Sequence, residues 1–166
     1  MKLLSWNIRS GGGKRCDAIA HAIAGHDADA VVLSEYRPRS SVPLLRELEG
    51  RGYGHFVLSD PDPKVGGVAI LSRLRMVEEK PRVALGGFAS RLRIARIPDA
   101  NLRVCGFYGP LPRDPYHDCW RATLRALREQ SPFPAIVAGD FNTGAPGGDG
   151  PGPSESCPTT PSCSSS

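Results

Sequence analysis

Four short apolar runs each stop at a polar residue of a type that enzymes use. The runs LLSW, AVVLS, VCGF and AIVAG are followed by Asn7, Glu35, Tyr108 and Asp140, and Asn142 lies two residues after Asp140. In sheets covered by helices, binding sites lie beyond one end of the strands, so neighbouring strands of the same direction would bring such groups together. The repetition therefore predicts one site built from all five side chains.

The residue types suit the binding of a hard cation. A carboxylate directly after a buried strand is costly unless it is paired or holds a metal, which favours Glu35 as a ligand of a divalent cation. Asp140 and Asn142 alternate along an extended segment, so both are expected to point the same way while Phe141 points into the core. We expect Mg²⁺, with Mn²⁺ as the alternative, because the donors are oxygens and the sequence has no His/Cys cluster.

Each of these residues also has an ordinary explanation. A lone Glu35 fits a strand end that faces water, and the Asp140/Asn142 pair fits a turn before Gly144. Asn7 fits a strand-capping amide and Tyr108 a half-buried strand tyrosine. Taken one at a time these explanations are the better ones, and only the joint pattern favours a site.

The elements that would position the site alternate between extended and helical segments, which favours a layered α/β fold. Strands are expected over Lys2–Ile8, Ala30–Glu35 and Ala135–Gly139. A first helix is expected from the spacing of Cys16, Ile19, Ala20 and Ile23, ending at Gly25, and further helices over 42–50 and 115–129. On the last helix the pattern predicts an apolar stripe of Tyr116, Trp120, Leu124 and Leu127, with Arg121, Arg125 and Arg128 together on another face. The closely spaced runs at 53–58, 66–72, 75–84, 91–97 and 102–108 predict antiparallel sheet.

Composition sets the limits of this interpretation. The 166 residues are 40% hydrophobic and 23% charged, as in ordinary soluble domains, and the net charge of +4 is too small to indicate a nucleic-acid binder by itself. The five cysteines form no CxxC pair, so reduced structural thiols are expected. Without an apolar run of membrane-spanning length or a signal peptide, we expect a cytoplasmic protein, and we expect a monomer.

The ordered motifs resemble those of the endonuclease/exonuclease/phosphatase superfamily of metal-dependent phosphoesterases. The matching segments are LLSWNIRSGGG, DADAVVLSEYR, GGVAILSR, VCGFYGPLP and AIVAGDFNTG, which run in the family's order. The resemblance implies a four-layer α/β sandwich, in which two mostly antiparallel sheets pack face to face with helices outside. It also implies hydrolysis of a phosphate ester by a phosphodiesterase, an endonuclease or a phosphatase, so that nucleic acid is one possible substrate.

The resemblance also implies roles for single residues. Glu35 matches the principal Mg²⁺ ligand and Asn7 the Asn/Asp beside that metal. Asp140 matches the residue that orients or deprotonates the attacking water, Asn142 the one that holds the phosphate, and Tyr108 a phosphate-contacting tyrosine. Arg9 and Arg37 follow the metal-site residues and would contact the substrate phosphate in a looser assignment.

One motif of the family is not found. Its Asp-His sequence should follow GDFN, but none of the four histidines comes after Asp140. We therefore expect an incomplete domain over 1–143 and a disordered Gly/Pro/Ser-rich tail over 144–166, the product of a frameshift or a premature stop, with a natural flexible tail as the alternative. The competing functional hypotheses are an inactive truncated fragment and a nucleic-acid-binding module without chemistry.

Overall fold

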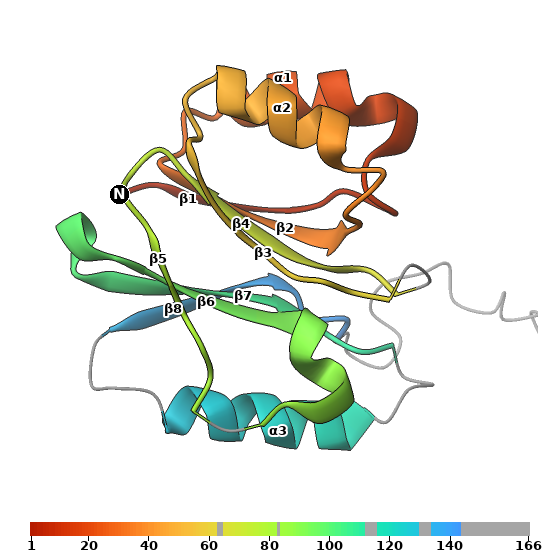
Figure 1. Cartoon of the computed structure of the whole chain (residues 1–166), viewed down its shortest axis with the longest axis vertical. Coiled ribbons are helices and arrows are strands. Elements are labelled where there is room, and N and C mark those ends of the chain that lie inside the picture. The colour runs from red at the N-terminus through yellow and green to blue at the C-terminus, as the bar shows by residue number, and fades with distance from the viewer. Residues whose placement is uncertain (63–64, 83, 112–115, 130–133, 144–166) are drawn as a thin grey trace, which may run out of the picture.

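Two four-stranded sheets form the centre of the molecule. The computed structural model describes residues 1–62, 65–82, 84–111, 116–129 and 134–143. The sheets pack face to face, with two helices outside the first sheet and one helix outside the second (Figure 1). This is the four-layer α/β sandwich that the sequence predicts.

The first sheet has the strand order β1-β2-β4-β3. Its strands are β1 (Leu3–Asn7), β2 (Ala30–Tyr36), β3 (His55–Leu58) and β4 (Gly67–Ser72). β1 runs parallel to β2, whereas β4 runs antiparallel to both β2 and β3. Both faces of this sheet are covered, and β2 and β4 accordingly consist mostly of buried β-branched and apolar residues.

The second sheet has the order β5-β6-β7-β8. Its strands are β5 (Val77–Glu79), β6 (Leu92–Ile97), β7 (Leu102–Tyr108) and β8 (Ala135–Asp140). β5, β6 and β7 are antiparallel, and β8 runs parallel to β7. Each sheet therefore ends in one parallel pair, β1/β2 or β7/β8. Parallel strands end at the same edge, which brings the polar residues after these four strands to one end of the sandwich.

Three apolar layers hold the sheets and helices together. α1 (Cys16–Gly25) and α2 (Val42–Gly50) pack on the first sheet through the face of α1 that the sequence predicts and through Leu44 and Leu48 of α2. Val32, Ile70 and Val104 lie between the two sheets. α3 (Tyr116–Arg128) packs on the second sheet beside Phe107. Short 3-10 turns lie at Gly13–Arg15, Gly86–Arg91 and Pro98–Ala100.

Two predictions about the elements need correction. The strand expected over 75–84 is only Val77–Glu79, although the closely spaced strands pair antiparallel as predicted, within two sheets. On α3, Leu124 is 46% exposed, because the buried face of that helix runs through Cys119, Thr123 and Ala126. These three follow the i, i+4, i+7 spacing that faces a sheet, and Leu124 lies off that line.

The described cysteines are free thiols, as predicted. Cys16, Cys105 and Cys119 are free and buried, whereas Cys157 and Cys163 lie outside the described residues, as does the predicted tail. Among the helices described, none has the length and apolar character required to cross a bilayer.

Candidate active site

Two carboxylates from different sheets meet on one amide group. The Asn7 Nδ2 donates to Glu35 Oε1 at 3.0 Å and to Asp140 Oδ2 at 2.7 Å. Asn7 and Asp140 end β1 and β8, Glu35 is the last residue but one of β2, and each of the three is half-buried. The structure thus brings together three of the residues that the sequence singles out, over separations of 28 and 133 residues.

Glu35 is aimed by an irregularity in its strand. The register between β2 and β4 shifts between Ser34 and Tyr36, so Glu35 is the extra residue of a bulge, with a φ of 60°. Bulges of this kind redirect a side chain at the edge of a sheet. Gly66 on the neighbouring segment makes room for it, since a Cβ there would lie 2.9 Å from the Cα of Glu35.

The loop after β1 holds the other atoms of this group. Ser10 N donates to Glu35 Oε2 at 2.7 Å, and Arg9 N donates to Asn7 Oδ1 at 2.8 Å. Both residues have positive φ, 50° for Arg9 and 56° for Ser10, a conformation that costs about 1 kcal/mol or more per residue and persists where surrounding contacts fix it. The strained loop therefore orients both the Asn7 amide and the Glu35 carboxylate.

A hydroxyl joins the two sheets directly beneath the carboxylates. Asp140 N donates to the Oγ of Ser34 at 3.0 Å, and the Ser34 side chain is fully buried. Ser34 precedes Glu35 in β2. Ser34 binds the backbone N–H of Asp140, and Glu35 shares the Asn7 amide with the Asp140 carboxylate. Sequence reasoning missed Ser34, because within AVVLSEY it looks like an ordinary core-strand residue.

Asn142 does not continue the extended strand, contrary to the sequence prediction. β8 ends at Asp140, and Asn142 has a φ of 48°. Its backbone N donates to Asp140 Oδ1 at 3.0 Å and its Nδ2 to the Gly109 carbonyl at 2.8 Å. The turn arises because the Asp140 side chain accepts the N–H two residues on, as Asx turns do. Phe141 packs against the apolar layer beneath α3, as predicted.

Tyr108 lies at the end of β7, in register with Asp140. Burial raises the pKa of its phenol, and the negative charges of Glu35 and Asp140 raise it further, against the opposing effects of Arg91 and Arg37. The guanidinium carbon of Arg91 lies 5.1 Å from the centre of the Tyr108 ring, and Arg91 donates to the Gly109 carbonyl at 3.0 Å. A tyrosine with a raised pKa stays neutral and remains a hydrogen-bond donor. Sequence reasoning missed Arg91, because no local pattern connects it to the site.

The two arginines assigned to phosphate have different surroundings. The Arg9 side chain is exposed, and the backbone N–H of Arg9 donates to the Asn7 side chain. Arg37 is half-buried in the loop after β2. Its charge lowers the pKa of Tyr108, against the larger effect of burial.

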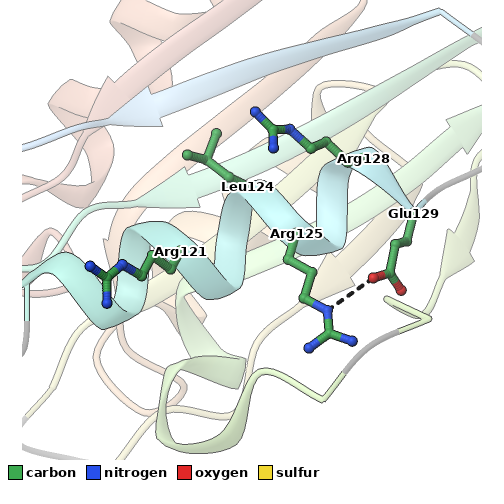
Figure 2. A pocket seen from close by; sticks show the side chains of 5 residues that line it. All are labelled: Arg121, Leu124, Arg125, Arg128 and Glu129. Carbon is green, nitrogen blue, oxygen red and sulfur yellow. Dashed lines mark hydrogen bonds and ion pairs between the residues drawn. The ribbon is translucent and has the colours of Figure 1, made fainter.

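The basic stripe on α3 lies elsewhere and does not form one site. Arg121, Arg125 and Arg128 line a shallow pocket of about 370 Å³ with Leu124 and Glu129, and their side chains point in different directions (Figure 2). Arg125 Nε forms an ion pair with Glu129 Oε1 at 2.9 Å, drawn as a dashed line in Figure 2. This arrangement is the solvated face of an amphipathic helix.

The four-layer sandwich and the carboxylate pair at the ends of its parallel strands define the class of protein. The molecule is a two-sheet α/β domain with an acidic site at one end of the sheets. The chain belongs to the Endonuclease/Exonuclease/phosphatase family, whose model matches residues 4–164. No curated protein matches the chain.

Solved structures of the superfamily share the fold. TDP2 of D. rerio, humanized by 14 mutations, is 18% identical with a TM-score of 0.61, over 86% of this chain and 62% of that chain. An endonuclease/exonuclease/phosphatase from Beutenbergia cavernae is 20% identical with a TM-score of 0.64, over 90% of this chain and 50% of that one. An AP endonuclease from Archaeoglobus fulgidus is also 20% identical, with a TM-score of 0.64, over 86% and 57%. The chain thus spans between half and about three fifths of the length of these proteins.

Proposed function

We propose that this chain hydrolyses phosphate esters with the help of a bound divalent cation, at the site formed by Glu35, Asn7 and Asp140. The observation that carries the proposal is the meeting of two carboxylates from different sheets on the Asn7 amide. Membership of the Endonuclease/Exonuclease/phosphatase family supports the reaction class. D. rerio TDP2, a protein of the same fold, has been solved in complex with a single strand DNA product, which supports nucleic acid as one substrate to test.

The donor atoms of the site suit Mg²⁺, and also Mn²⁺. The described residues contain no group of three or more His, Cys, Asp or Glu side chains that could hold a metal. Mg²⁺ does not require such a cage, because it is usually bound through one or two carboxylates together with waters and substrate phosphates. Glu35 would hold the cation, with Asp140 beside it and Asn7 keeping both carboxylates in place. When bound, the cation would polarise a phosphate oxygen as a Lewis acid.

The remaining steps use the chain's own groups. Asp140 accepts a proton from the attacking water, since its Oδ1 and Oδ2 each receive one N–H and retain lone pairs. The neutral Tyr108 phenol donates a hydrogen bond to the phosphate. Asn142 donates through its second amide hydrogen, while the first holds the Gly109 carbonyl. Arg9 and Arg37 supply positive charge for the phosphate oxygens.

The test is hydrolysis of bis-p-nitrophenyl phosphate, a diester, and p-nitrophenyl phosphate, a monoester, by the purified chain with Mg²⁺ and with EDTA. We expect activity only with the cation and a loss of about 10²- to 10⁴-fold in Glu35→Gln and in Asp140→Asn. Glu49→Gln, at an exposed position of α2, is the matched control and should keep full activity. Calorimetric titration with Mn²⁺ adds a readout independent of turnover, since Glu35→Gln should weaken binding and Glu49→Gln should not.

Three outcomes would contradict the proposal. Unchanged activity in both Glu35→Gln and Asp140→Asn would refute the assignment of these residues to the active site. A wild-type chain that hydrolyses neither ester would favour an inactive fragment. Salt-sensitive DNA binding that survives both substitutions without any hydrolysis would favour a binding module.

A further inference from the structure

A second pocket is lined by the segment that follows the strand of Glu35. It has a volume of about 410 Å³ and is formed by the loop after β2 and the loop after β3. Its lining residues are Arg37, Pro38, Arg39, Ser40, Asp60 and Pro61. The first of these loops begins directly after β2, the strand that carries Glu35.

Arg37 connects the pocket to the site. It lines the pocket, and its charge also lowers the pKa of Tyr108. The Nε of Arg37 is shielded from solvent and has no hydrogen-bond partner among the described residues. A group seated in the pocket would therefore bind the terminal nitrogens of this guanidinium, which carry its other hydrogen-bond donors.

The charges that line the pocket favour an anion. Two arginines, Arg37 and Arg39, line the pocket together with one acidic residue, Asp60. Within the part of the chain that the structure describes, no ion pair joins any two of the three. Asp60 acts on a neighbouring group, because its charge raises the pKa of the buried Tyr36 phenol. Arginine presents a planar fork of donors that fits phosphate oxygens.

The wall of the pocket is built on the loop that orients Glu35. The Ser40 Oγ lies 3.5 Å from the Ser10 carbonyl, and the Ser41 Oγ donates to the Gly11 carbonyl at 3.3 Å. Ser10 N in turn binds Glu35. A group bound in the pocket is therefore held in a defined position relative to the carboxylates.

We propose that this pocket binds a second phosphate group of the substrate, one that neighbours the phosphate attacked at Glu35 and Asp140. This inference rests on the proposed function. It narrows the substrate to compounds with at least two phosphates, and a short nucleic-acid strand carries its phosphates in such a series. Arg39 binds the second phosphate, Arg37 lies between it and the attacked phosphate, and the negative charge of Asp60 on the facing loop weakens that binding.

The experiment compares the thymidine dinucleotide TpT with the same dinucleotide phosphorylated at its 5′ or its 3′ end. Binding is measured in EDTA, so that no turnover is needed, and kcat/KM is measured with Mg²⁺. We expect one terminal phosphate to raise affinity about tenfold in the wild type, as one charge-assisted contact does. Arg39→Gln should reduce that gain to about twofold, and Asp60→Asn should increase it.

Arg46→Gln is the matched control, because Arg46 is an exposed arginine of α2 outside the pocket lining. It should keep the tenfold gain. Inositol 1,4-bisphosphate compared with inositol 1-phosphate forms the second arm. If the second phosphate raises the affinity for both the dinucleotide and the inositol phosphate, the pocket recognises the phosphate itself. If it raises the affinity for the dinucleotide alone, the pocket recognises a nucleic-acid strand.

The outcomes separate this inference from the proposed function. The pocket proposal is refuted if a terminal phosphate at neither end raises the affinity, or if it raises the affinity equally in Arg39→Gln and Arg46→Gln. Either result refutes it even where the chain hydrolyses simple esters. An Arg39-dependent gain in binding by a chain that hydrolyses nothing supports the pocket and refutes the proposed function.

Discussion

Replacing Ser34 by alanine should damage both the stability and the activity of the molecule. Ser34 Oγ is the acceptor for Asp140 N at 3.0 Å across the two sheets, and its side chain is fully buried. Alanine leaves that N–H without its partner, which costs about 1–3 kcal/mol. For a chain of this size the loss corresponds to a fall in Tm of about 2–12 °C.

The effect on turnover follows from the position of Asp140. Its backbone is tied to the first sheet by the Ser34 hydroxyl, so without that bond the Asp140 carboxylate shifts relative to Glu35. A displacement of about 1 Å at a reacting group costs on the order of 10²-fold in rate, so we expect kcat for bis-p-nitrophenyl phosphate to fall at least tenfold. Urea unfolding and steady-state kinetics, with the kinetics measured well below the onset of unfolding, provide the two readouts.

Ser72 offers a control of the same residue type in the same sheet. It is fully buried, and its Oγ donates to the Asp29 carbonyl at 3.2 Å and accepts from Leu74 N at 3.0 Å. It pairs with Ala30, at the opposite end of β2 from Glu35. Ser72→Ala should therefore lose similar stability and keep its kcat. Equal losses of kcat in the two variants, or full kcat in a destabilised Ser34→Ala, would refute the positioning of Asp140 by Ser34.

Three further predictions concern Tyr108, Cys105 and Gly109. Because the pKa of Tyr108 is raised, Tyr108→Phe should lower kcat/KM about tenfold at every pH from 6 to 9, and a loss confined to alkaline pH would contradict a neutral donor. Burial raises the pKa of Cys105 from 9.0 to about 11, so its contribution to stability is complete below pH 9 and is lost as the pH rises toward 11. Urea unfolding should show the stability advantage of the wild type over Cys105→Ala shrinking by about 2 kcal/mol across that interval, and a constant difference would exclude a buried thiol. A Cβ at Gly109 would overlap the Phe141 carbonyl, so Gly109→Ala should destabilise the fold by at least about 2 kcal/mol, whereas Gly25→Ala, with open space around it, should change the free energy of unfolding by less than about 1 kcal/mol.

The sequence predicts those parts of the fold that depend on local patterns. The apolar runs that end at Asn7, Glu35 and Asp140 give their strands to within about two residues, and the structure places the three side chains in contact. The face of α1 follows from the spacing of its apolar residues in the same way. The catalytic roles of these residues stay predictions until the variants are measured.

Features that depend on distant contacts were not predicted. The role of Ser34 rests on an N–H that lies 106 residues away in the other sheet, and no window of sequence contains both groups. Alternation along a strand predicts that Asn142 points with Asp140, but the side-chain acceptor on Asp140 turns the chain first. The apolar spacing on α3 predicts a buried stripe that includes Leu124. In the structure Leu124 is exposed, and the smaller residues Thr123 and Ala126 are buried instead.

The division of the site between two sheets has a consequence for the order of events during synthesis. Asn7 and Glu35 belong to the sheet made from the first half of the chain, whereas Tyr108 and Asp140 belong to the sheet made from the second half. The Asn7–Asp140 hydrogen bond closes a loop of 133 residues, so it forms only after β8 has emerged from the ribosome and the sheets have docked. A nascent chain therefore holds Glu35 and Asp140 apart until its fold is closed.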